Sequence, residues 1–209
     1  MCPSNRQARP WHGYWTVSVH ACHPVVSTRQ LSATRSTTLH VLFVCTGNIC
    51  RSPTAERLAL AMAKEAGIPY FDASSAGTRA VVGHPVHPDA ERVLVALGGD
   101  AANFAARHLT AKIATGADLI LTMTRTHRDA VLEVAPQRLR RTFTLLEAAR
   151  LVTEQNARTV ADLANLRPHL DDNNNIDIAD PIGQSSEVFA AIGDQIAAAL
   201  PPIVELCRS

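Results

Sequence analysis

The segment Cys45–Pro53, which reads CTGNICRSP, brings together side chains that could do phosphoryl chemistry. Cys45 and Arg51 are separated by five residues. A cysteine reacts as its thiolate, and a neighbouring guanidinium favours that form. The Arg51 guanidinium can also hold two phosphoryl oxygens in a bidentate fork, and it does not lose its charge. The pair therefore predicts nucleophilic attack on a phosphoryl group.

The residues around this segment predict a strand, a tight loop and the start of a helix. Residues 39–44 are mostly apolar, rich in branched side chains and too few for a helix, which indicates a buried strand. Gly47 and Asn48 are residue types that tolerate the positive φ of a tight loop. Ser52 is expected as the helix N-cap and Pro53 as the first helical residue. Such a loop turns backbone N–H groups towards an anion at a helix N-terminus.

These expectations give each part of the loop a role. Cys45 is the candidate nucleophile, and Arg51 is the candidate charge clamp. The donors that bind a phosphate also stabilise the charge on a transferring phosphoryl group. A buried structural cysteine beside a surface arginine is the alternative, but it does not explain why strand, turn residues and helix start coincide. The candidate phosphate-binding residues are Thr46, Gly47, Asn48, Ile49, Cys50, Arg51 and Ser52.

The rest of the chain alternates strand and helix patterns. The later expected strands are 70–76, 118–122 and 141–145. The expected helices are 53–65, 88–97, 126–134, an additional helix within 151–166, and a last helix from Ser185 that Pro201 and Pro202 should end or kink. This alternation predicts an α/β fold with a parallel sheet. The loop would then lie at the carboxyl ends of the strands, where such sheets bind ligands.

Four segments, in order along the chain, resemble the low-molecular-weight protein tyrosine phosphatase family of bacteria. The CTGNICRSP loop resembles that family's phosphate-binding loop, and Ser75–Thr78 resembles the end of its second strand. Asp118–Met123 resembles its third strand, and Asp180-Pro181 its late loop. The resemblance covers about residues 39–206. It implies a three-layer, flavodoxin-like fold in which a four-stranded parallel sheet has helices on both faces.

The resemblance also implies a hydrolase, a protein-tyrosine phosphatase that cleaves phosphomonoesters through a phosphocysteine on Cys45, with no cofactor and no metal. In this family the late loop supplies the general acid, which implies that Asp180 protonates the leaving oxygen. Asp177 is a rival for that role, although no proline follows it. Cys50 has a counterpart in the family. It is either a small buried residue or a thiol that traps an oxidised Cys45 as a disulfide.

The departures from the family bear on the substrate. Members that act on phosphotyrosine line their cleft with aromatic residues, whereas this chain has Arg79–Val82 and Ile182-Gly183 at those places. Ring stacking on a phenyl group is therefore weakened. Related phosphoarginine phosphatases have threonine where this chain has Ile49, which favours phosphotyrosine and leaves phosphoarginine open. An arsenate reductase on this fold would need further cysteines, and none lies between Cys50 and Cys207. A non-catalytic phosphoprotein-binding module would not need the nucleophile.

Composition limits the classes of binding partner and the cellular compartment that we expect for this protein. A net charge of +1 gives no electrostatic case for nucleic acid, and no apolar run is expected to reach the length of a membrane span. The five cysteines are odd in number and two lie in the loop, which does not indicate a disulfide framework. A working thiolate fits a reducing, cytoplasmic setting. The expected partner is a tyrosine-phosphorylated protein, such as a bacterial tyrosine kinase or its target.

Residues 1–38 are a different kind of sequence. They contain arginines but no acidic residue, and both tryptophans of the chain lie among them. They show no helix or strand period and no compact apolar stretch of a signal peptide. We expect a basic, disordered N-terminal extension, or a start codon placed upstream of the true one. The phosphatase domain is expected over 39–209.

Overall fold

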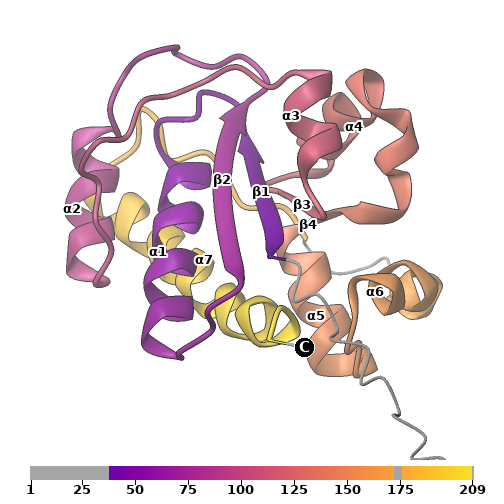
Figure 1. The fold of residues 1–209 in the computed structure, drawn as a ribbon. Helices are drawn as coiled ribbons and strands as arrows, with labels where there is room; N and C mark the ends of the chain where they lie inside the picture. The colour runs from indigo at the N-terminus through magenta and orange to yellow at the C-terminus, as the bar shows by residue number, and fades with distance from the viewer. Residues whose placement is uncertain (1–37, 172–175, 209) are drawn as a thin grey trace, which may run out of the picture. The chain divides into compact units, whose positions relative to one another are not determined.

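The computed structural model describes residues 38–171 and 176–208 (Figure 1). By its internal contacts the chain divides into residues 1–35 and 36–209. The expected N-terminal extension lies outside the described residues, so its disorder stays a prediction. The fold below is that of the second unit alone.

The centre of this unit is a sheet of four parallel strands in the order β2-β1-β3-β4. The strands are β1 Leu39–Cys45, β2 Phe71–Gly77, β3 Leu119–Thr122 and β4 Thr142–Thr144. All of β3 and β4 and most of β1 are buried, as expected of strands that are covered on both faces. The expectation of a four-stranded parallel sheet is therefore confirmed.

Helices cover the two faces of this sheet and make a three-layer fold. The helices are α1 Arg51–Glu65, α2 Pro88–Ala96, α3 Ala111–Gly116, α4 Arg125–Val134, α5 Leu145–Gln155, α6 Val160–Leu166 and α7 Ser186–Leu206. Short 3-10 turns follow at Pro136–Arg141 (η1) and Arg167–His169 (η2). Alternate residues of β1 supply the two cores: Val41 and Phe43 pack with α1, α5 and α7, whereas Leu42 and Val44 pack with α3 and α4. Figure 1 shows α1 and α7 on one side of the strands and α3 and α4 on the other.

Helix α1 begins earlier than the sequence indicated. Its first residue is Arg51, and its N-cap is Cys50, without a side-chain cap. The expectation that Ser52 caps the helix and Pro53 opens it was wrong by two residues. The Ser52 hydroxyl instead contacts the Cys45 sulfur. Pro53 fits the third helical position because the N–H groups of a first turn have no partner within the helix.

Helix α7 runs through Pro201 and Pro202, so the expectation that these prolines end it was wrong. Their rings remove two helical N–H donors. Leu200 and Ile203, both fully buried, hold the last turns in the core and offset that loss. By length and composition α7 could cross a membrane, which the sequence reading did not anticipate. In this structure it packs as a core helix against α1, α2 and α5.

The additional helical region expected within 151–166 forms the end of α5 and all of α6. The turn η2 follows α6 and places Arg167 against strand β4, at the edge of the sheet. Its guanidinium donates to the Thr142 carbonyl at 2.6 Å and lies 4.1 Å from the centroid of the Phe143 ring. It also bonds Glu147 on α5. This region therefore covers the outer edge of the sheet.

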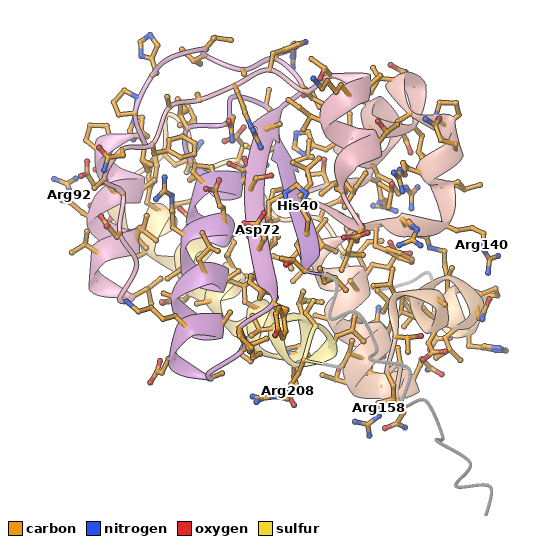
Figure 2. All side chains as sticks on the ribbon, in the orientation of Figure 1. His40, Asp72, Arg92, Arg140, Arg158 and Arg208 are labelled. Atoms are coloured by element: carbon orange, nitrogen blue, oxygen red, sulfur yellow. The ribbon has the colours of Figure 1, made fainter. Side chains whose placement is uncertain are left out.

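Charged side chains at the ends and outer faces of the helices point away from this core. Figure 2 shows Arg92, Arg140, Arg158 and Arg208 projecting outward from the ribbon. Arg140 donates to the Asn165 amide oxygen, and Arg208 pairs with Glu205. Such exposed contacts contribute little stability, so the buried polar residues near β1 are the informative ones.

Candidate active site

The loop Thr46–Cys50 joins the carboxyl end of β1 to the start of α1. Cys45 ends the strand, is buried, and is the register partner of Gly77 at the end of β2. A Cβ at Gly77 would lie 2.5 Å from the Thr46 carbonyl oxygen and 3.0 Å from Asn48. The end of β2 therefore needs glycine because the loop passes directly over it.

Asn48 organises the interior of the loop. It adopts φ 55 and is fully buried, which confirms a positive-φ position there, whereas Gly47 is not in that region. Its amide oxygen accepts the Arg107 backbone N–H at 2.9 Å, which fixes the orientation of the amide. The amide nitrogen then donates to the hydroxyls of Ser52 at 3.0 Å and Ser75 at 2.8 Å.

These hydrogen bonds give the hydroxyls a direction. Ser52 accepts from Asn48, so its own proton is available to the Cys45 sulfur, 3.0 Å away. A hydroxyl donor at that distance stabilises a thiolate. Ser75 likewise accepts from Asn48 and donates to a Glu56 carboxylate oxygen at 2.6 Å. Burial of Glu56 raises the pKa of its carboxyl above the ordinary value.

The Arg51 guanidinium is buried beside the loop, with only 3 % of the residue exposed. One terminal nitrogen donates to the Ile178 carbonyl at 3.0 Å, and the other lies 2.5 Å from an Asp180 carboxylate oxygen. Within the described residues the buried Nε has no hydrogen-bond partner. An unsatisfied buried donor costs about 1–3 kcal/mol. An oxyanion in the loop is an acceptor of the right charge for it.

Asp180 and Asp177 lie on one loop but have different surroundings. The Asp180 side chain is 46 % exposed and meets Arg51 across the cleft. Asp177 accepts from the Arg125 backbone N–H at 2.8 Å and pairs with the Arg125 side chain. The loop is further held by the Ile178 N–H, which donates to the Met123 carbonyl at 2.7 Å. Asp177 thus ties the loop to α4, whereas Asp180 faces the buried guanidinium.

A cleft opens beside Arg51 between the loop, the start of α4 and the Asp180 loop. Its lining residues are Thr46, Arg51, Thr124, Thr126, His127, Asp177, Ile178, Ala179 and Asp180. The lining is mostly hydroxyls, carboxylates and one imidazole, with no phenyl or indole ring among these residues. Residues 79–82 and 182–183, where the sequence predicted that aromatic walls are missing, are not part of this lining, so that interpretation stays a prediction.

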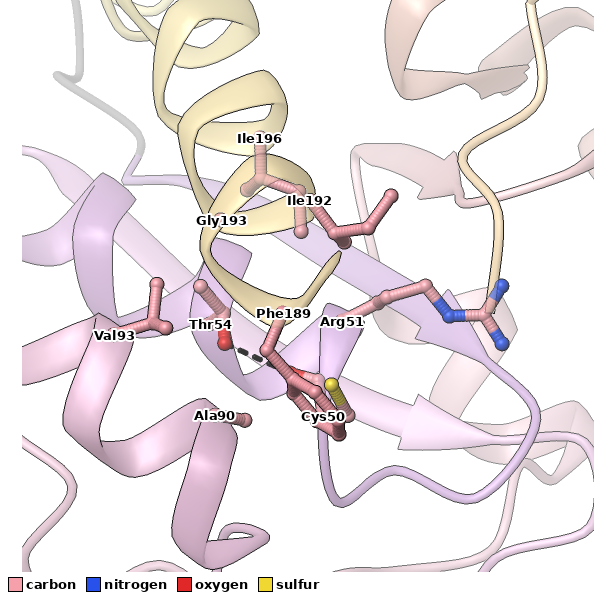
Figure 3. A pocket seen from close by; sticks show the side chains of 9 residues that line it. All are labelled: Cys50, Arg51, Thr54, Ala90, Val93, Phe189, Ile192, Gly193 and Ile196. Atoms are coloured by element: carbon pink, nitrogen blue, oxygen red, sulfur yellow. Dashed lines mark hydrogen bonds between the residues drawn. The ribbon is translucent and has the colours of Figure 1, made fainter. Parts of the chain in front are cut away.

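Cys50 lies behind the loop, away from this cleft. Figure 3 shows its sulfur beside Phe189 in a small hollow between α1, α2 and α7. The Thr54 hydroxyl donates to the Cys50 carbonyl at 2.9 Å. Burial, with a contribution from Cys45, raises the pKa of the Cys50 thiol to about 12. Cys50 is therefore a neutral thiol in an apolar hollow, and a redox role stays a prediction.

The structure brings together the residues that sequence reasoning proposed for chemistry. Arg51 and Asp180 are in direct contact, and Ser52 joins the first turn of α1 to Cys45. Sequence reasoning missed the partners that orient the loop. These are Ser75, Glu56, Arg107 and His127. Among the residues that the structure describes, no group of His, Cys, Asp or Glu side chains is arranged to hold a metal ion.

Fold and site together define a class: an α/β protein in which a cysteine-containing loop joins the carboxyl end of a parallel strand to the N-terminus of a helix. A family model, low molecular weight phosphotyrosine protein phosphatase, matches residues 40–150. The Wzb phosphatase of Escherichia coli K12 is 32% identical over 153 residues, which are 73% of this chain and 84% of that protein. The chain belongs to the low molecular weight protein-tyrosine-phosphatase family.

Other relatives match over a shorter length. Wzb of Salmonella typhi is 40% identical over 97 residues, which are 46% of this chain and 62% of that protein. The chain thus spans less than two thirds of that relative. Two solved structures have the same fold. The tyrosine phosphatase AmsI of Erwinia amylovora is 29% identical with a TM-score of 0.61, covering 79% of this chain and 91% of its own. The YwlE arginine phosphatase of Geobacillus stearothermophilus is 30% identical with a TM-score of 0.62, covering 80% and 91%.

Proposed function

We propose that this protein is a cysteine-dependent phosphomonoester hydrolase and that its main activity is that of a protein-tyrosine phosphatase. The observation that carries the proposal is the Arg51 guanidinium, which is buried beside the Cys45 loop and in contact with Asp180. Relatives with tyrosine-phosphatase names support it. The substrate would be a tyrosine-phosphorylated protein, such as a tyrosine kinase or its target, in the reducing cytoplasm.

The reaction would proceed in two displacements. The Cys45 thiolate attacks phosphorus, the bond from phosphorus to the leaving oxygen breaks, and Asp180 gives that oxygen its proton. Water then attacks the phosphocysteine, Asp180 takes a proton from it, and phosphate and the thiolate are released. Arg51 and the backbone donors of residues 46–52 hold the phosphoryl oxygens throughout. No metal is needed for charge compensation in this scheme.

The ion pair between Arg51 and Asp180 implies a rearrangement on binding. To act as an acid on a leaving oxygen, Asp180 must turn away from Arg51, since a carboxylate oxygen of Asp180 lies 2.5 Å from that guanidinium. An incoming phosphoryl dianion would compete for the guanidinium and release Asp180. The side chain is half-exposed, which leaves it free to turn towards a leaving oxygen.

The nucleophile is tested by Cys45→Ser. We expect the variant to lose turnover but to bind inorganic phosphate or vanadate, because Arg51 and the loop donors remain. Cys207→Ser, a cysteine buried at the end of α7, is the matched control and should keep its turnover. Substantial hydrolysis by purified Cys45→Ser would remove Cys45 from the mechanism.

We also propose that residues 39–209 carry the activity, so deletion of residues 1–38 should change turnover by no more than a few-fold.

A second candidate substrate is phosphoarginine. The polar, carboxylate-bearing cleft favours a cationic leaving group, and a solved relative is an arginine phosphatase. Ile49, in place of threonine, favours phosphotyrosine. Competition between phosphotyrosine and phosphoarginine peptides of one sequence, read as the ratio of kcat/KM, decides between them. A ratio in favour of phosphoarginine would replace the main proposal.

A further inference from the structure

His127 joins the phosphate loop to helix α4, although neither its residue type nor its position suggested this. It lies in the first turn of α4 and only 6 % of the residue is exposed. Its Nε2 is 2.8 Å from the Thr46 hydroxyl oxygen. Its Nδ1 is 2.9 Å from the hydroxyl of Thr124, the N-cap of the same helix. The ring thus bridges Thr46 in the loop and Thr124 at the start of α4.

Thr46 is the residue directly after Cys45, so its position affects the start of the loop. Its backbone carbonyl accepts the Arg79 N–H at 2.9 Å, on the side of β2. Its side chain is held by His127, on the side of α4. The first loop residue is therefore fixed from both sides. Loss of the imidazole would remove this hydrogen bond between the loop and α4.

The ring suits this role as a neutral group. Burial, and next the charge of Arg51, lower the pKa of the His127 imidazole to about 4. A neutral imidazole has one donor and one acceptor nitrogen, which matches two hydroxyl partners. A charged ring would add a second cation beside Arg51. As a neutral ring, His127 can hold both hydroxyls at once.

We propose that His127 is a positioning residue of the phosphoryl-transfer site, which acts through Thr46 by holding the first residue of the phosphate loop against α4. The inference rests on the proposed function. An anion-binding loop gains its strength from donors that are fixed before the anion arrives. Loss of the bridge should therefore weaken both phosphate binding and turnover, and it should do so only through Thr46.

Two substitutions of His127, by glutamine and by asparagine, distinguish this positioning role from simple packing. A glutamine at 127 can place its amide where Nε2 lies and reach Thr46, whereas an asparagine reaches only as far as Nδ1 and Thr124. We expect His127→Gln to keep kcat/KM within about threefold of wild type. His127→Asn should lose about tenfold, the order expected for one hydrogen bond. Equal losses in the two variants, or no loss in His127→Asn, would overturn the proposal.

A double-mutant cycle tests whether the effect passes through Thr46. Thr46→Val removes the hydroxyl and keeps the shape of the side chain. We expect it to lose about as much kcat/KM as His127→Asn, and the double variant to lose no more than the larger single loss. Losses that multiply in the double variant would mean that His127 acts by another route. Thermal unfolding of each variant shows whether the measured protein is folded.

A binding measurement keeps this test separate from the proposed function. Inorganic phosphate is titrated into three proteins: Cys45→Ser alone, Cys45→Ser with His127→Gln, and Cys45→Ser with His127→Asn. Weaker binding in the Asn variant alone supports the bridge even if the protein shows no phosphatase activity. Unchanged phosphate affinity in all three, together with normal turnover of His127→Asn, would reject the bridge and leave the proposed function intact.

Discussion

At the scale of single residues, the Ser52 hydroxyl has the clearest chemical consequence. It lies 3.0 Å from the Cys45 sulfur and receives a hydrogen bond from Asn48, so its own proton is available to the sulfur. Thiolate is the leaving group when water attacks phosphocysteine. We expect Ser52→Ala to slow that step and to lower kcat by about 10–100-fold, the range for a hydrogen bond to a charged group. Burst kinetics with an aryl phosphate measures it, because the phosphoenzyme should then accumulate. A lower rate without a burst would place the effect in the first step.

Asp180 makes a prediction that depends on the leaving group. A tyrosyl oxygen leaves poorly without a proton, whereas an acidic phenol such as p-nitrophenol leaves readily. General acids contribute about 10²–10⁴-fold, so Asp180→Asn should lose roughly that much on a phosphotyrosine peptide and less on p-nitrophenyl phosphate. Asp177→Asn is the control: its amide oxygen can still accept from the Arg125 N–H, and we expect little loss. The plot of turnover against leaving-group pKa should be steeper for Asp180→Asn than for wild type. Identical slopes would assign the acid to another group.

Residue types near the loop led to a hypothesis about its chemistry but did not predict the residues that support it. Cys45, Arg51 and Asn48 could be assigned from their spacing and from the turn they predict. Glu56, Ser75, Arg107 and His127 could not, since these support contacts join residues 19 to 81 positions apart in sequence, and Arg107 contributes through its backbone N–H. No local pattern encodes such contacts. One histidine or serine on a strand or helix can serve many purposes, so its position in the sequence alone does not predict that it supports the loop.

At the scale of elements, the end of β2 is adapted to the loop that crosses it. A methyl group at Gly77 would collide with the Thr46 carbonyl, which is backbone and cannot rotate away. We expect Gly77→Ala to destabilise the fold by about 1–3 kcal/mol, the range for overpacking, and to weaken phosphate binding. Gly116→Ala in α3 is the matched control, because a Cβ there meets no atom within 4 Å. Denaturant unfolding of both variants checks this, and equal stabilities would mean that the loop can shift.

Strand and helix patterns predicted most elements to within a residue or two. The strand at 118–122 became β3, and the helix at 126–134 became α4. The failures have physical causes. Ser52 does not cap the helix, because its hydroxyl contacts the Cys45 sulfur instead. Pro201 and Pro202 were tolerated because tertiary burial of their neighbours outweighs local propensity. The short helix α3 has too few residues for a periodic pattern to stand out.

At the scale of the whole molecule, stability should depend on pH through His127. The imidazole pKa is about 4 in the folded protein against an ordinary 6.5. Between these values the unfolded chain binds more protons, so stability falls as the pH decreases through this window. Glu56 acts in the opposite direction, since its raised pKa favours the folded state at low pH. Comparison with His127→Gln, which cannot titrate, isolates the histidine. From pH 7 to pH 4.5, urea unfolding should show a larger loss of stability in wild type than in this variant, and parallel losses would contradict it.

The contact of Arg167 in η2 with strand β4 bears on the tendency of this protein to aggregate at high concentration. A strand at the edge of a sheet offers unpaired carbonyl and N–H groups to any other extended chain, which is a route to aggregation. Here the Thr142 carbonyl is already occupied by Arg167, whose guanidinium also lies over the Phe143 ring. A charged, bulky side chain thus stands where a foreign strand would have to pair. The turn η2 therefore places a charged, bulky side chain against the outer edge of the sheet, where it would hinder pairing with another copy of the chain.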